Sequence, residues 1–107
     1  MAWRVETLSQ DVDDELAGLP ADLRAKFMHI AELLEALGSF QVREPYVKPL
    51  GGKLFEMRMK GKSGIARAIY TPAAGERRVV LPAFVKKSQK TPPSAIRTAL
   101  ERSKRIR

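Results

Sequence analysis

Residues 79–93 read VVLPAFVKKSQKTPP, and the order of apolar and basic residues in this stretch decides the fold. Residues 79–85 are almost continuously apolar, which is typical of a strand that is covered on both faces. Three basic residues follow within five positions: Lys86, Lys87 and Lys90. We therefore expect a central strand that delivers a group of lysines to one edge of a sheet.

The prolines of this stretch indicate where regular structure is interrupted. Pro82 has no N–H group to donate to a strand ladder, so we expect a bulge or an unpaired position there. Thr91 is suited to cap a helix whose first position is Pro92. Helical spacing predicts that the buried side of this helix contains Ile96, Ala99 and Leu100.

The first half of the chain predicts a strand followed by two helices. Trp3 and Val5 alternate with charged residues, which indicates a short strand within residues 2–7 that has one buried face. Apolar residues then recur at helical spacing, and they predict one helix from residue 9 or 10 to 17 and a second from 20 to 37. These two helices should form an amphipathic hairpin.

The second half predicts an antiparallel meander. Residues 39–52 contain two prolines and a Gly-Gly pair, so we expect a loop. Alternating side chains predict strands over 53–60 and 65–70, and a turn leads into the apolar strand that ends at Val85. The predicted class is α+β in the order β-α-α-β-β-β-α. A small antiparallel-rich sheet would be covered by the helical hairpin and completed by a C-terminal helix.

Length and composition exclude several classes of protein. At 107 residues the chain is expected to form one domain, residues 1–107. It has no cysteine and a single histidine, His29, so nucleophilic cysteines and zinc sites built on Cys or His are excluded. The sequence shows no export signal and no run of about 18 apolar residues, so we expect a cytoplasmic protein without a membrane span.

The net charge of +8 is unevenly distributed along the chain. Residues 1–40 contain three basic and eight acidic residues, whereas residues 41–107 contain seventeen basic and four acidic residues. A basic excess of this size favours a polyanionic partner such as RNA, because phosphate contacts dominate affinity for nucleic acids.

Three runs of the sequence carry a family resemblance. They are residues 48–58 (KPLGGKLFEMR), 67–70 (RAIY) and 84–92 (FVKKSQKTP). Together they resemble the RelE/HigB toxin superfamily, specifically its phage-derived HigB-like branch. The third run is the most specific, because the combination of an aromatic residue, paired lysines and Lys-Thr-Pro at a strand end is characteristic.

The resemblance implies a RelE-like fold and a toxin of a type II toxin-antitoxin system. Such toxins cleave mRNA, usually in the ribosomal A site, and a cognate antitoxin holds them inactive. In this branch the antitoxin is often a helix-turn-helix protein, so toxin-antitoxin hetero-oligomers are expected. We expect no cofactor and no metal. A ribose 2′-hydroxyl can attack the neighbouring phosphate when positive side chains stabilise the added negative charge and a proton carrier is present.

The resemblance also implies roles for individual residues. It places four basic residues around the scissile phosphate: Arg58, Arg67, Lys86 and Lys87. Contacts to the rest of the RNA would come from Lys48, Lys53, Lys60 and Lys90. Glu56 and Tyr70 are the candidate proton carriers. No tyrosine or histidine follows Tyr70, and Pro82-Ala83 stands where many relatives have His-Gly, so the general acid or base is left open.

Alternative interpretations exist for the chain and for its residues. The missing late proton carrier also fits a non-catalytic basic module that binds RNA or the ribosome. Glu56 and Arg58 would share one strand face, where they could form a surface charge pair, and Tyr70 could be a packed aromatic residue. Arg67 alternates with isoleucines, which would place its charge in or beside the core. An unpaired charge is costly there, so Arg67 requires a partner or an anion.

Overall fold

The computed structural model describes residues 3–37, 46–86 and 90–106. Within these ranges the chain forms five strands and three helices. In chain order they are β1 (Arg4–Thr7), α1 (Gln10–Ala17), α2 (Ala21–Leu37), β2 (Val47–Gly51), β3 (Leu54–Gly61), β4 (Gly64–Ala73), β5 (Arg77–Lys86) and α3 (Pro93–Ser103). The α+β class and the order of the predicted elements are confirmed, with β2 as an additional strand.

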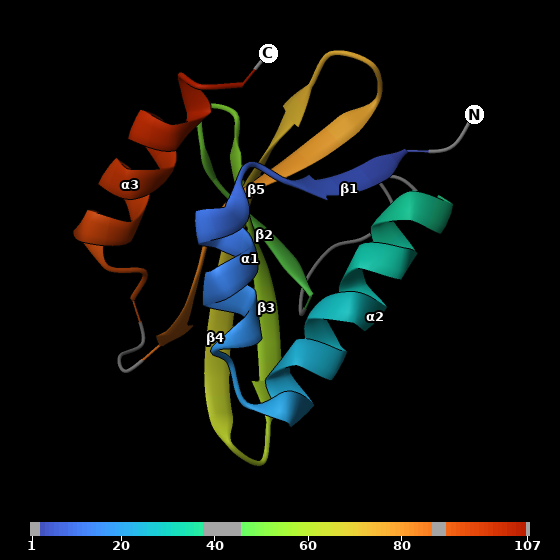
Figure 1. Ribbon diagram of the computed structural model, residues 1–107, viewed down its shortest axis with the longest axis vertical. Coiled ribbons are helices and arrows are strands. Elements are labelled where there is room, and N and C mark those ends of the chain that lie inside the picture. Colours follow the sequence, from blue (N-terminus) through green and yellow to red (C-terminus); the bar gives the residue numbers. More distant parts are fainter. Residues whose placement is uncertain (1–2, 38–45, 87–89, 107) are drawn as a thin grey trace.

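The strands form one sheet in the order β1-β5-β4-β3-β2 (Figure 1). β2 to β5 are antiparallel to their neighbours, whereas β1 runs parallel to β5 at one edge. The apolar strand that ends in lysines therefore lies inside the sheet, between β1 and β4. The expected central position of this strand is confirmed.

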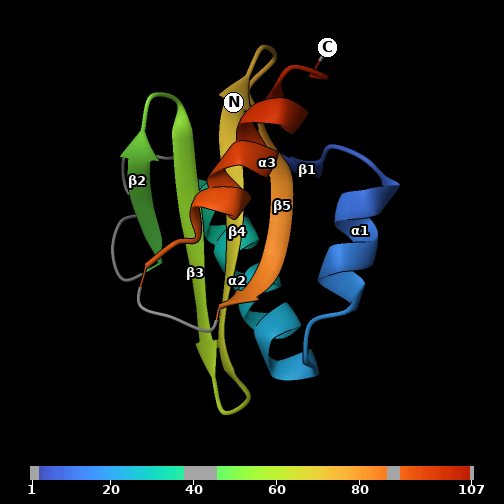
Figure 2. The ribbon, with the colours of Figure 1, turned by 90° about the vertical axis from the view of Figure 1, so that its left-hand side faces the viewer.

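The two faces of the sheet are covered by different helices (Figure 2). α1 and α2 pack on one face, and their main core residues are Val12, Leu23 and Ile30. Met57, Met59 and Tyr70 of the sheet contact this layer. α3 covers part of the opposite face, where it packs on Leu54, Ile69, Val79 and Leu81. The alternation predicted for β3 and β4 is confirmed, because odd positions of β3 and even positions of β4 face the helical hairpin.

The prediction of a loop over residues 39–52 is wrong for its second part. Residues 47–51 form β2, whose register with β3 pairs Val47 with Met57 and Lys48 with Glu56. The strand is short and its register shifts after Pro49, so its sequence lacks a clear alternating pattern. It is stabilised by its pairing partner and by the buried side chain of Val47. Residues 38–45 lie outside the described residues.

The start of α3 also differs from the prediction. Pro92 occupies the N-cap position and the helix begins at Pro93, whereas Thr91 lies one residue earlier and its hydroxyl donates to Glu56. Thr91 therefore does not cap the helix, because its side chain serves the sheet instead. The predicted buried stripe is right for Ile96 and Ala99 but not for Leu100, which is half-exposed.

The interruption expected at Pro82 is confirmed as a bulge. Ala68 pairs with Ala83 and Tyr70 pairs with Val80, so Leu81 and Pro82 together oppose a single residue of β4. The extra residue reverses the alternation of β5 beyond this point. Val80 and Ala83 both face the helical hairpin, and the side chains of Phe84 and Lys86 face the α3 side.

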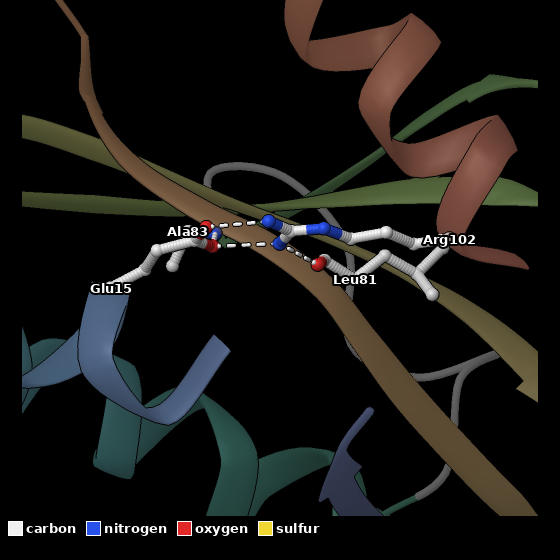
Figure 3. Close-up of polar contacts among 4 residues, drawn as sticks. All are labelled: Glu15, Leu81, Ala83 and Arg102. Atoms are coloured by element: carbon white, nitrogen blue, oxygen red, sulfur yellow. Dashed lines mark hydrogen bonds and ion pairs between the residues drawn. The ribbon is translucent and has the colours of Figure 1, made fainter. Parts of the chain in front are cut away.

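An ion pair between α1 and α3 provides hydrogen-bond partners for two backbone groups of this bulge (Figure 3). β1 ends at Thr7, opposite Val80, so β1 does not extend along the later part of β5. Arg102 of α3 donates to the Leu81 carbonyl at 2.6 Å, and the Ala83 N–H donates to the Glu15 carboxylate of α1 at 3.1 Å. Two further contacts, of 3.0 and 2.8 Å, join Arg102 directly to Glu15. The pair thus connects the two helical layers around the edge of β5.

Replacing Arg102 by Met should destabilise the protein. The change leaves the Leu81 carbonyl and the Glu15 carboxylate without their guanidinium partner, at a cost of about 2 kcal/mol. Such a loss lowers the Tm of a domain this size by roughly 10 °C, which thermal unfolding followed by circular dichroism would detect. Lys104→Ala is the control, because its pair with Glu101 is exposed and worth under about 1 kcal/mol. Equal Tm values for both variants would contradict the proposed role of the pair.

Candidate functional site

Charged side chains lie together on the face of the sheet that α3 partly covers, in the part of that face on which α3 does not pack. Strand pairing places Arg58 of β3 opposite Arg67 of β4, and Lys86 of β5 opposite Ile65. Arg58, Arg67 and Lys86 therefore come from three adjacent strands and share one face. We call these three residues the basic cluster.

A buried carboxylate lies at the centre of the basic cluster. Glu56 is only 1% exposed, although it belongs to a residue type that is rarely buried. Its Oε1 atom lies 3.3 Å from Nε of Arg67 and 3.9 Å from Nε of Arg58, and its Oε2 atom accepts a hydrogen bond from the Thr91 hydroxyl. Glu56 thus ties two arginines to the segment that precedes α3. The alternative of a surface charge pair between Glu56 and Arg58 is wrong, because Glu56 is buried.

Arg67 has the partner that its position in the sequence requires. The residue is 5% exposed, and its Nη1 donates to the Ala66 carbonyl at 3.1 Å. Burial lowers the pKa of Arg67 below its ordinary value, and the negative charge of Glu56 opposes this shift. Arg67 is therefore a buried cation, and its charge is balanced mainly by the carboxylate of Glu56.

Lys86 is the third member of the basic cluster and is also buried. Burial lowers the pKa of Lys86 from its ordinary value of 10.5, and the positive charges of Arg67, Arg58 and Lys48 lower it further. Glu56 opposes these effects but does not cancel them. A lysine in this environment releases its proton more readily than a solvated lysine does, which suits proton transfer.

A cavity of about 450 Å³ adjoins two members of the basic cluster. Tyr46 lines this cavity directly before β2 begins, and its carbonyl accepts a hydrogen bond from the Arg58 N–H. The side chain of Tyr46 is 38% exposed and its ring contacts His29 edge-on. The full lining consists of Lys26, Ile30, Tyr46, Arg58, Lys60, Ile65 and Arg67.

Four of the seven lining residues were not among the predicted site residues: Lys26, Ile30, Tyr46 and Ile65. Tyr46 falls in the stretch 39–52 that was expected to be a loop, and Lys26 falls in the second predicted helix. A tyrosine that lies between two prolines, next to a basic stretch of sequence, is by itself only weak evidence for a binding site. The contribution of α2 becomes visible only when the helix is packed against β3.

The other basic residues named from the sequence are more scattered. Lys48 on β2 lies opposite Glu56, and Lys60 lines the cavity, so both border the basic cluster. Lys90 is exposed just before Thr91. Lys53 lies in the β2–β3 turn and borders a different cavity near the end of α3, away from the cluster. Lys87 lies outside the described residues.

The structure separates Tyr70 from the basic cluster. Tyr70 is fully buried in the core under α1 and α2, and its ring stacks on Phe55 with centroids 5.6 Å apart. Because Tyr70 and Arg67 point to opposite faces of β4, a proton cannot pass between Tyr70 and RNA at the cluster. The position of Tyr70 therefore argues against a role as proton carrier and supports its interpretation as a packed aromatic residue.

In residues 3–37, 46–86 and 90–106, His, Asp and Glu side chains form no group of three that could ligate a metal ion. None of the helices in these ranges has the length and apolar character needed to cross a bilayer.

Comparisons with known proteins place the chain among related sequences and folds. Residues 14–104 match the model of a family described as phage-derived protein Gp49-like. One chain of the crystal structure of the archaeal RelE–RelB complex from Pyrococcus horikoshii OT3 is 25% identical and superposes with a TM-score of 0.58. The match covers 79% of this chain and 96% of that chain. No match was found among curated proteins.

Replacing Glu56 by Gln should destabilise the fold. Arg67 would then lose its counter-charge in a buried position, and breaking a buried pair in this way costs about 3 kcal/mol. Denaturant unfolding of Glu56→Gln and of Glu101→Gln would compare this buried carboxylate with an exposed one, for which a change below about 1 kcal/mol is expected. A Glu56→Gln variant as stable as the parent would show that Arg67 is neutralised by another group.

Proposed function

The chain belongs to the Gp49-like family of phage-derived proteins, within the RelE/HigB-like superfamily of toxins from toxin-antitoxin systems, and we propose that it is a metal-independent endoribonuclease that cleaves mRNA on the ribosome. The observation that carries this proposal is the basic cluster. Three cations from three adjacent strands surround one buried carboxylate beside a cavity with an exposed tyrosine. Such a group of fixed positive charges suits a reaction in which negative charge grows on a phosphate.

In the proposed reaction, the ribose 2′-hydroxyl loses its proton to solvent water and attacks the adjacent phosphorus, and the bond to the 5′-oxygen breaks. The products are a 2′,3′-cyclic phosphate and a 5′-hydroxyl end. Arg58 and Arg67 stabilise the charge that develops on the non-bridging oxygens, and Lys86 donates a proton to the leaving 5′-oxygen. The lowered pKa of Lys86 supports this assignment, because an acid that releases its proton more readily transfers it more easily in the transition state.

Glu56 has a positioning role in this proposal. Both of its carboxylate oxygens are engaged, one by the arginines and the other by Thr91. A carboxylate held in this way orients the two guanidinium groups before RNA binds, so less reorganisation is needed during the reaction. Lys87 is assigned to the same site on the family resemblance and on its position next to Lys86.

The bound RNA is proposed to extend from the basic cluster along its borders. Lys48, Lys60 and Lys90 would contact backbone phosphates on either side of the cleaved bond. Tyr46 presents an exposed ring beside the cavity, and base stacking on such a ring contributes about 1–3 kcal/mol per base. Lys53 is left out of this path because it borders another cavity.

The proposed partner is an antitoxin. This proposal is supported by the solved relative, which is one chain of a RelE–RelB complex. The basic cluster is suited to acidic segments of such a protein, because complementary charge favours association. We propose a helix-turn-helix antitoxin encoded beside the toxin gene, and toxin-antitoxin hetero-oligomers in the cytoplasm.

Cleavage should depend on the basic cluster and not on metal ions. Purified protein added to a translation reaction should cut mRNA equally well with and without EDTA. Arg58→Ala should slow cleavage about 100-fold, because removing one group that stabilises the transition-state charge typically costs this much. Lys104→Ala removes an exposed cation at the C-terminal end of α3 and should leave the rate unchanged.

The same assay decides between an enzyme and a binding module. Salt-sensitive binding to ribosomes with intact mRNA would favour the non-catalytic module and end the nuclease proposal. Growth arrest on induction should be relieved by co-expression of the adjacent small reading frame. If none of the neighbouring frames relieves it, the proposed partner is wrong even if cleavage is found.

The pH dependence of cleavage should report the proton on Lys86. Lys86 can act as an acid only while it is protonated. Because its pKa lies below the ordinary 10.5, the protonated form is lost at a lower pH than in a solvated lysine. Cleavage should therefore fall at alkaline pH. Lys86→Arg keeps the positive charge but is a poor acid, so it should be about 100-fold slower and show no alkaline fall. An unchanged alkaline limb in Lys86→Arg would assign the titration to another group.

A further inference from the structure

A second buried arginine lies on the opposite face of the sheet from the basic cluster. Arg78 of β5 is 0% exposed, and its alternation with Val79 places it with Val80 on the α2 side. All three of its guanidinium nitrogens are buried and make no hydrogen bond within the described residues. A guanidinium group stays charged at physiological pH, so it cannot avoid this situation by losing a proton. Arg67 resolves the same problem with Glu56, whereas the described residues supply no carboxylate to Arg78.

The aromatic ring beside Arg78 leaves its hydrogen-bond donors free. Cζ of Arg78 lies 3.9 Å from the centroid of the Trp3 ring, which is a cation–π contact. In this contact the indole covers the flat face of the guanidinium group. The N–H bonds lie in the plane of the group and point outward from its rim, so they remain available to an acceptor that approaches edge-on.

A further unused donor lies close to Arg78. The Tyr70 hydroxyl is buried and makes no hydrogen bond, and burial raises the pKa of Tyr70 to about 12, so it keeps its proton. The positive charge of Arg78 and a polar contact of its guanidinium group with the Tyr70 hydroxyl oppose this rise, although the geometry of the contact falls short of a hydrogen bond. Arg78 has only donors, and the Tyr70 hydroxyl adds a further donor to the same small region of the core.

We propose that Arg78, Tyr70 and Trp3 form a carboxylate-binding site, distinct from the proposed nuclease site. A carboxylate places two oxygens in one plane and so matches the rim of a guanidinium group with two parallel hydrogen bonds, and the Tyr70 hydroxyl can donate to one of these oxygens. A phosphate fits less well. It carries about 1.5 to 2 negative charges, and a site with one cation among apolar side chains would leave part of that charge uncompensated.

Trp3 controls access to the site. Pairing of β1 with β5 begins at Arg4, so the backbone of Trp3 lies outside the ladder, and its side chain is partly exposed. β1 itself is a four-residue edge strand. Rotation of the indole away from Arg78 would open the site without breaking a strand pair. The carboxylate could belong to a free organic acid or to an acidic side chain of a bound protein, and the chemistry of the site is the same for both.

The fluorescence of Trp3 provides a direct test, because it is the single tryptophan of the chain. Sodium acetate should produce a saturable change of Trp3 emission with half-saturation in the millimolar range, measured against sodium chloride at equal ionic strength. Arg78→Met should abolish the change, since it keeps an apolar side chain of similar length but has no donors. Arg77→Met is the matched control, because it removes the neighbouring positive charge from the opposite face and should leave the change intact.

Two additional measurements keep the test independent of variant folding. In the parent protein, the Nε–H resonance of Arg78 should shift with acetate along the same saturation curve. Acetate should also raise the Tm of the parent but not that of Arg78→Met, because a ligand stabilises only the state that binds it. A short peptide containing Glu that binds more than tenfold tighter than acetate, while its Gln counterpart fails, identifies a protein side chain as the source. Equal binding of free acetate and peptide identifies a free acid.

Three results would overturn the proposal. The first is the lack of a saturable response of Trp3 and Arg78 to acetate in the parent protein. The second is tighter binding of inorganic phosphate than of acetate, which would assign the site to another class of anion. The third is an acetate response of Arg78→Met equal to that of the parent. Messenger RNA cleavage is not a readout in any of these measurements, so failure here leaves the proposed function untouched.

Discussion

The bulge at Leu81 and Pro82 is the constraint on which the arrangement of this protein depends. In a regular strand, residues 78, 80, 82, 84 and 86 would share one face, and Lys86 would then point under α2 with Arg78. The bulge adds one residue against β4, so the alternation reverses and Lys86 faces the same side as Arg67 and Glu56. A proline at this position ensures the interruption, because it has no N–H group for the ladder. Lys86 therefore joins the basic cluster because β5 is irregular.

A bulge inside a sheet exposes backbone groups that need partners, and the way they are satisfied links the site to the rest of the fold. The Leu81 carbonyl and the Ala83 N–H are bonded by Arg102 and Glu15, which come from helices on opposite faces. The same strand that carries Lys86 is thus held from both layers just before the site. This support makes the position of Lys86 less dependent on the residues that follow it, and preorganisation of this kind is what electrostatic catalysis requires.

Features that depend on the local pattern of residues could be predicted from the sequence. Features that depend on which strands and helices pack together could not. Alternation was sufficient to place Glu56 and Arg58 on one face and to indicate that Arg67 needs a partner, because these signals lie within single strands. β2 was missed because Pro49 and the glycines hide a strand that is stabilised by its neighbour. The role of Thr91 was misassigned for a similar reason. Its hydroxyl had a local use as a helix cap and a distant use at Glu56, and only the packing of α3 on the sheet decides between them. Tyr70 was named as a candidate proton carrier although the alternation of its strand already places it on the opposite face from Arg67.

The two buried arginines show how one sheet can hold positive charge for different purposes. Arg67 has a carboxylate at 3.3 Å, but the same carboxylate also faces Arg58, and Lys86 lies nearby, so the face as a whole carries more positive than negative charge. This excess of positive charge disfavours the isolated fold, and binding of a phosphate or an acidic segment, as proposed above, would relieve it. Arg78 has an aromatic face and no carboxylate, so its need is for a single planar acceptor rather than for an extended polyanion. The amount and shape of the missing negative charge therefore differ between the two faces, and this difference is the physical reason to expect a different ligand on each.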